Sequence, residues 1–205
     1  MIKKVLVLLL VLSLYSVPAF ANDDLETVKN SVHKMADDVL AILKRTDIDK
    51  KTRDVKVIKI VMPLFDFKKM AKLSLEKKFW KPLSKEKRKE YTDLMIARVQ
   101  ESYLEKLDIY TDEEVVMGEA TQVKKRIHIK TILISKDERI DIVYKFYKSK
   151  SGWKVYDIVI LGVSIVQTYR SQFSDVLKAG TFDDLLAKLK VTGEFTVPTP
   201  EVSGK

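Results

Sequence analysis

Few residues of this sequence are of the types used in catalysis or metal binding, and those few are widely separated in the sequence. Two histidines are present, His33 and His128. His128 lies between Arg126 and Lys130 in an alternating stretch, where the neighbouring charges oppose the binding of a cation. His33 lies beside an apolar helical stripe. Neither histidine has a set of partners at the spacing of a metal site, so we expect no bound metal.

Nucleophilic chemistry lacks its usual residues as well. Cysteine is absent, which removes thiol nucleophiles and thiolate metal sites. Gly162-Val163-Ser164 resembles part of a nucleophile elbow, but Val166 stands where that motif requires its second glycine. Six glycines in 205 residues could hardly build a phosphate loop. Adjacent acidic pairs fall mostly at expected helix starts or loops, where they serve capping and solubility. The sequence therefore predicts no enzyme and no cofactor.

What stands out instead is a surplus of apolar residues in the second half. The stretch Trp153–Leu161 is apolar at both alternating positions towards its end, and Ile132–Ile134 repeats this pattern. An antiparallel sheet with one wet face should alternate apolar and polar residues cleanly. Two explanations are open. Either helices cover both sides of these strand ends, or an apolar pocket for a hydrophobic ligand lies between sheet and helices.

The elements that must position these residues begin with helices. From Asp23, apolar residues recur every three or four positions, which predicts a long helix with Asp23 at its cap. Pro63 ends the second helix, and Ser84 caps the fourth and longest, which follows a break at residues 79–82. The helices predicted in this half are residues 23–42, 51–62, 66–75 and 84–110.

After Thr111 the apolar period changes from about 3.6 to 2, which predicts strands joined by short turns in an antiparallel meander. Helices then resume, with Gly180 and Thr181 between the last two. The predicted strands are residues 115–120, 126–135, 140–148 and 153–161, and the predicted helices are 165–179 and 182–190. The expected fold is α+β, a curved antiparallel sheet of about four to five strands. The mostly helical N-terminal half and the C-terminal helices would form an apolar pocket on it.

The N-terminus predicts export. Lys3 and Lys4 precede an apolar run over residues 5–17, and residues 18–21 end in the small-x-small pattern of a cleavage site. A membrane anchor is the alternative, but the run is short for a span of about 30 Å. We therefore expect a signal peptide over 1–21 that is cleaved after Ala21. A single domain over 22–190 and a disordered tail over 191–205 should follow.

The net charge limits the classes of binding partner but does not identify one. Without Lys3 and Lys4, 36 Lys and Arg face 29 Asp and Glu, a net charge of +7. Such a balance can favour nucleic acid, anionic lipid surfaces or acidic partners, or it can be a solvated lysine-rich surface. Outside the cytoplasm nucleic acid is the weakest of these, so no nucleic-acid partner is expected.

One block of the sequence resembles a known family. Residues 153–165, followed by Tyr169-Arg170-Ser171-Gln172-Phe173, resemble the signature of the MlaC family of periplasmic phospholipid carriers, also called toluene-tolerance auxiliary proteins. The stretch 65–71, Trp80 before the Ser84 cap, and the closing helix from Phe182 agree in order, so the resemblance covers nearly all of residues 22–205. Two departures are Leu161, where the family usually has Glu, and the absence of an expected glycine between Ala71 and Trp80.

The resemblance implies a function and partners. Proteins of this family shuttle phospholipids between an inner-membrane ABC-transporter complex and an outer-membrane lipoprotein–porin complex, without bond chemistry. Acyl chains are buried in the domain and the head group stays near the mouth. The expected localisation is therefore the periplasm, and the expected state is a monomer.

The side chains predicted to line the pocket come from three strands, the last long helix and the fourth helix. Arg170 is a candidate for the head group or the mouth, although an ion pair with Asp157 would explain it equally well. The parity of the last strand is uncertain by pattern alone, because both of its faces are apolar. The predicted lining residues are Tyr103, Leu107, Ile127, Ile129, Tyr144, Phe146, Tyr156, Ile158, Ile160, Val166 and Tyr169.

Two other functions remain open at this level. One is an enzyme or small-ligand binder on a cone-like scaffold such as the NTF2-like group, which would need convergent polar groups in the pocket. The other is a periplasmic chaperone or interaction module that holds proteins on its apolar surface. A chaperone would purify empty or with peptides, whereas a carrier would purify with phospholipid.

Overall fold

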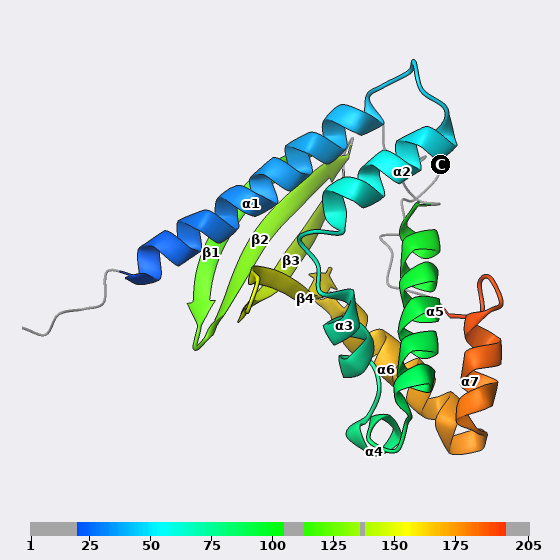
Figure 1. Cartoon of the computed structure of the whole chain (residues 1–205). Helices are drawn as coiled ribbons and strands as arrows, with labels where there is room; N and C mark the ends of the chain where they lie inside the picture. The colour runs from blue at the N-terminus through cyan, green and yellow to red at the C-terminus, as the bar shows by residue number, and fades with distance from the viewer. Residues whose placement is uncertain (1–19, 105–112, 136–137, 196–205) are drawn as a thin grey trace, which may run out of the picture.

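The structure is a computed structural model that describes residues 20–104, 113–135 and 138–195 (Figure 1). These residues form seven helices and five strands. The helices of the N-terminal half are α1 (Phe20–Leu43), α2 (Lys50–Val61), α3 (Phe67–Leu73), α4 (Lys77–Trp80) and α5 (Lys85–Leu104). The strands are β1 (Glu114–Val123), β2 (Arg126–Ser135), β3 (Glu138–Ser149), β4 (Gly152–Ile160) and β5 (Val163–Ser164). Helices α6 (Ile165–Ala179) and α7 (Phe182–Leu189) follow.

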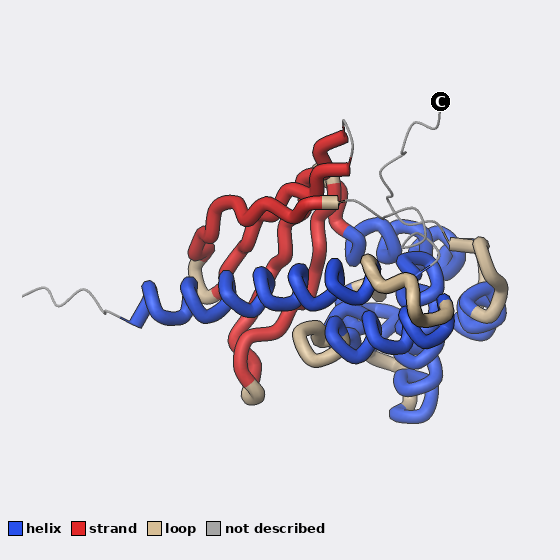
Figure 2. The backbone as a smooth tube through the Cα atoms, turned by 90° about the horizontal axis from the view of Figure 1, so that it is seen from above, coloured by secondary structure: helices blue, strands red, loops and turns tan. Residues whose placement is uncertain are grey.

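The five strands form one curved antiparallel sheet in the order β1-β2-β3-β4-β5, which confirms the α+β fold class (Figure 2). Alternation and short turns gave the meander, and β2 and α6 have the predicted bounds. The register shifts between Met117 and Ala120, so β1, an edge strand, contains a bulge. Such an insertion bends and twists the strand.

A second bulge accounts for part of the apolar surplus of β4. Lys145 pairs with Asp157 while Phe146 pairs with Val155, so Tyr156 has no partner of its own. Side chains normally alternate between the faces, but the extra residue resets this alternation. Val155 and Ile158 therefore lie on the same inner face. Tyr156 was predicted to share that face with Ile158; it lies on the outer face instead, where its hydroxyl accepts from Arg126 at 2.8 Å.

The helices cover the inner face of the sheet in two separately packed regions. The larger cluster joins α3, α5, α6 and α7 to the ends of β3 and β4, around Tyr91, Tyr169 and Phe173. The smaller cluster joins the first half of α1, through Val28 and Val32, to β2, β3 and β4. These two regions are the core, and between them the second half of α1 and α2 pass over the sheet (Figure 1).

Helix ends differ from prediction in two places. Helix α1 begins at Phe20, so Asp23 lies in its first turn and does not cap it. The expected break after α3 contains the helical turn α4, whose Trp80 packs edge-on against Tyr91 with ring centroids 6.3 Å apart. The aromatic contact holds this segment against α5, which a local pattern of polar and proline residues does not reveal.

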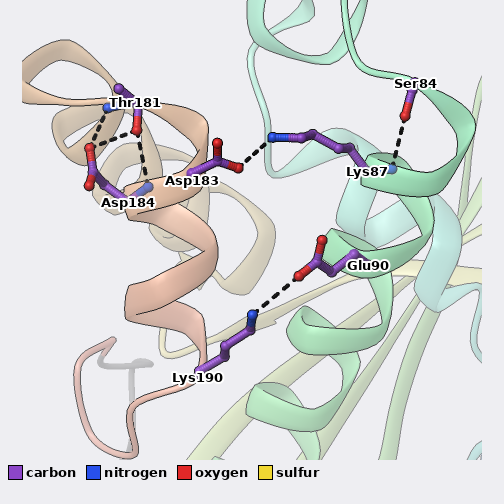
Figure 3. A network of polar contacts seen from close by, with 7 residues as sticks. All are labelled: Ser84, Lys87, Glu90, Thr181, Asp183, Asp184 and Lys190. Atoms are coloured by element: carbon purple, nitrogen blue, oxygen red, sulfur yellow. Dashed lines mark hydrogen bonds and ion pairs between the residues drawn. The ribbon is translucent and has the colours of Figure 1, made fainter.

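Helix α7 is fastened to α5 by charged side chains (Figure 3). Thr181 and Asp184 form a capping box at its start, with the Asp184 amide donating to the Thr181 hydroxyl at 3.2 Å. Lys87 of α5 pairs with Asp183, and Lys190 pairs with Glu90 at 3.2 Å. These exposed pairs add little stability by themselves, and the packing of the apolar sides of the two helices holds them together.

The predicted ends of the domain fall partly outside the described residues. The predicted signal peptide lies almost wholly outside them, as do residues 196–205 of the tail predicted over 191–205 and the end of the helix predicted to reach Tyr110. Phe195 is buried and packs edge-on against Phe173, with ring centroids 4.9 Å apart, so the packed chain reaches at least this residue. Among the described helices, none is both long and apolar enough to cross a membrane.

A buried carboxylate joins the sheet to α6. Asp157 is 5% exposed and faces the outer side of β4. It accepts from Lys145 Nζ at 3.0 Å, from the Ser164 hydroxyl at 2.8 Å and from the Val166 amide at 3.2 Å. Ser164 is itself the cap of α6. The Asp157 carboxylate thus accepts hydrogen bonds from β3, from the Ser164 hydroxyl in β5 and from the N-terminal end of α6, where the helix dipole is positive.

We expect Asp157→Ala to lower the free energy of unfolding by about 3 kcal/mol, because it leaves the Lys145 ammonium half-buried and without its partner. The matched control is Asp141→Ala, which breaks a similar cross-strand pair with Lys130 that is 42% and 51% exposed. That change should cost about 1 kcal/mol or less. Urea unfolding followed by tryptophan fluorescence measures both, and equal losses would contradict the special role of Asp157.

Candidate functional site

A cavity of about 310 Å³ lies between the inner face of the sheet and helices α1, α2, α3 and α5. It separates the two packed clusters, and its walls are almost wholly apolar. Its size is at the lower end of the ~300–1,000 Å³ typical of ligand pockets. An empty apolar cavity of this size forfeits many packing contacts, which a hydrophobic ligand would restore.

Helix α1 serves two purposes along one stripe. Its first half fills the smaller cluster with Val28 and Val32, which are fully buried. Its second half continues the same three-and-four spacing but faces open space. The cavity residues of this half are Met35, Ala36, Val39, Leu40 and Leu43. A continuous apolar stripe is therefore half core and half cavity wall.

Helix α2 and the chain after it close the opposite side of the cavity. In α2 only Val57 is buried; Ile58 and Val61 are partly exposed although they face the cavity. After α2, the chain pairs with β4 at the bulge, where the Asp66 amide donates to the Val155 carbonyl at 2.8 Å. This pairing places Phe65 and Phe67, whose rings stack at 5.4 Å, at the cavity.

The sheet supplies the floor in rows of paired residues. Tyr144 of β3 lies opposite Ile158 of β4, and Ile142 lies opposite Ile160. Leu133 of β2 lies opposite Ile140. All of these residues line the cavity. The resetting of β4 by its bulge is what brings Ile158 and Ile160 into these rows.

Among the described residues, four polar side chains interrupt the apolar wall. Thr131 and Tyr144 bring hydroxyls to the sheet side, and burial raises the pKa of Tyr144, while the Thr131 hydroxyl moderates that rise. Gln100 of α5 donates to the Met62 sulfur at 3.3 Å, which joins α5 to the end of α2. Glu113 lies beside β1 and is 7% exposed. These few polar groups could orient a ligand. The rest of the surface that would hold it is hydrocarbon-like.

Three predicted lining residues lie on the cavity wall, namely Tyr144, Ile158 and Ile160. Others lie beyond its two ends. Ile127, Ile129 and Phe146 are buried in the smaller cluster against α1.

Val166 and Tyr169 of α6 are buried as well, outside the cavity wall. Tyr169 belongs to the larger cluster, and burial there raises its pKa to about 12. Leu107 and the side chain of Tyr103 lie outside what the structure describes. Tyr156, as shown above, lies on the outer face.

Arg170 lies away from this cavity. It borders a separate polar hollow of about 260 Å³ with Glu76, Ser174 and Lys178. Ser174 donates to Glu76 at 2.6 Å, and this bond, with the contribution of Lys78, lowers the pKa of the Glu76 carboxyl. The alternative pairing with Asp157 does not form in the described residues either, because Lys145 and Ser164 surround that carboxylate.

The described residues contain no group of three or more His, Cys, Asp or Glu that could hold a metal ion. His33 pairs with Asp37 four positions later at 2.7 Å on the exposed side of α1, a contact that the sequence analysis overlooked. The wall residues that it missed belong to α1, α2 and α3, and also to α5 and the sheet, for example Val99, Leu133 and Ile142. The apolar pattern of these elements was visible, but such a pattern does not tell packed core from cavity wall.

Comparisons with known proteins agree with this geometry. The family model described as MlaC protein matches residues 33–191. Among solved structures, the chain has the fold of the phospholipid-binding protein from Ralstonia solanacearum, which was solved in complex with a phospholipid. The TM-score is 0.72 at 24% identity, over 79% of this chain and 94% of that chain. No match was found among curated proteins. The match over most of its length shows that this chain belongs to the MlaC family.

Proposed function

We propose that this protein carries a phospholipid through water with the acyl chains in the cavity and the head group outside it. The observation that supports this most is the cavity itself, an apolar space that the fold leaves between two well-packed clusters. Exposing acyl chains to water costs about 0.8 kcal/mol per CH₂. A wall with so few polar residues can shield such chains from water, but it offers too few hydrogen-bond partners for a polar ligand.

The wider role follows from the family. The protein would receive and deliver lipid at membrane complexes of an Mla-type ABC system, working in the periplasm after removal of a signal peptide at Ala21. The family match and the phospholipid bound to the protein of similar fold support this assignment. A carrier of this kind would break no bond of the lipid that it moves.

Organic extraction and mass spectrometry of freshly purified protein test the proposal directly. We expect phospholipid at close to one molecule for each protein, because a single cavity accounts for the binding. Peptides in place of lipid would support a chaperone. A folded protein that is free of lipid and does not take it up from vesicles would contradict carriage.

Ile158→Glu should reduce the co-purified phospholipid about tenfold or more, because a carboxylate in the wall must either be desolvated or be protonated. The matched control is Val159→Glu, one residue along on the outer face of the same strand, which should keep its lipid. Lipid phosphorus per protein measures both, and urea unfolding checks that each is folded. Unchanged lipid in a folded Ile158→Glu protein would contradict the proposal that this part of the cavity wall contacts the lipid.

Ala36→Phe should have opposite effects on stability and on binding. The new ring would enter the cavity from α1, which should raise the melting temperature of lipid-free protein while lowering its lipid uptake. Ala71→Phe is the contrasting change, because Ala71 is 0% exposed in the packed cluster and overpacking there should destabilise. A loss of stability in Ala36→Phe as large as in Ala71→Phe would mean that the space near Ala36 is not available.

A further inference from the structure

Two hairpin turns lie at the same end of the sheet and are rich in lysine. In an antiparallel meander, the β1–β2 and β3–β4 turns must share one end. The first turn is Lys124–Lys125, between the paired residues Val123 and Arg126. The second is Lys150–Ser151, between the paired ends of β3 and β4. We call these two turns, with Val123 and Arg126, the basic end of the sheet.

The charge of this end is one-sided. Residues 120–130 contain four Lys and Arg and no Asp or Glu, and residues 142–156 contain four Lys and no Asp or Glu. Lys145 and Lys148 have carboxylate partners, Asp157 and Asp24. The turn lysines Lys124, Lys125 and Lys150 are exposed, and no ion pair joins them to another described residue. Their positive charges are therefore available to an anionic binding partner at this end of the sheet.

The backbone of the first turn has a conformation that lysine does not prefer. Lys124 has φ +57°, a left-handed conformation that glycine or asparagine adopts more easily. The Gln122 side chain supports the turn by donating to the Lys124 carbonyl at 3.1 Å. Beside it Val123 is 43% exposed, an apolar side chain among cations. Placing a lysine where glycine fits better, next to an exposed valine, points to a binding surface.

The composition of the basic end favours a bilayer over a protein. Protein interfaces are depleted in Lys and enriched in Arg, whose fixed fork suits a single carboxylate. Here lysines predominate, and a lysine acts as a flexible point charge that suits a diffuse anionic surface. An exposed aliphatic side chain adds affinity at the head-group boundary, and Val123 lies beside the first turn.

We propose that the basic end of the sheet docks the protein on an anionic phospholipid bilayer. This goes beyond lipid carriage and does not depend on it, because the surface lies outside the cavity. The two are physically connected, however. Asp24, near the start of α1, accepts from Lys148 at 2.9 Å and from the Trp153 indole at 2.8 Å, and the same helix continues into the cavity wall.

Sedimentation with vesicles tests the docking surface in the whole purified protein. Vesicles that contain phosphatidylglycerol should retain it at low salt, whereas pure phosphatidylcholine vesicles should not. Each cation near an anionic surface contributes about fivefold to partitioning, so the triple variant K124Q/K125Q/K150Q should bind about a hundredfold more weakly. Raising the salt from about 0.01 M to 0.1 M should also weaken binding, because the screening length falls from about 30 Å to 10 Å.

The matched control is K77Q/K81Q/K85Q, which removes the same charge from exposed residues around α4. It should lose far less binding than the turn variant. Equal losses in the two variants would show that net charge alone attracts the protein and would overturn the docking surface. So would retention of the wild type by polyglutamate but not by anionic vesicles, which would assign the turns to an acidic protein. Lipid extraction from the turn variant separates this result from carriage, since its cavity is unchanged.

Discussion

The structure depends on a separation between two hydrophobic clusters that share one sheet. The first half of α1 packs one end of the inner face, and α3, α5, α6 and α7 pack the other. Ile158 is the partly buried side chain that touches both. Because each cluster is fully packed by its own helices, neither needs the middle of the sheet. The cavity can therefore remain open or be filled by a ligand without unfolding either side.

The order of elements could be predicted from the sequence because periodicity changes sharply after Thr111. The bounds of β2 and α6 agree with those expected from alternation, from the helical apolar period and from Gly180. The bulge at Tyr156 could not be predicted, because an extra residue in one strand shows only as apolar residues at both parities. That pattern was also compatible with a pocket or with helices on both sides. The structure contains the pocket, and the reset alternation of β4 is a further contribution to the pattern.

The candidate site was predictable only in part, for a related reason. Tyr144, Ile158 and Ile160 were expected at the cavity and lie on its wall, whereas Ile129 and Phe146, on the same inner face, lie in the packed cluster. Inner face and cavity wall are different properties, and sequence alternation reports only the first. Which part of the face stays uncovered depends on where α1 and α2 cross the sheet. That crossing is a tertiary property.

The bulge in β1 has a consequence for self-association. β1 is a long edge strand, and an unbroken edge is a template on which a second copy can add a strand. Between Met117 and Ala120 the ladder shifts, so the free backbone groups on the outer side no longer form a regular row. The protein already contains an apolar cavity, and a regular free edge would add a second route to self-association. The bulge interrupts that second route, because a copy cannot add a regular strand along the whole edge.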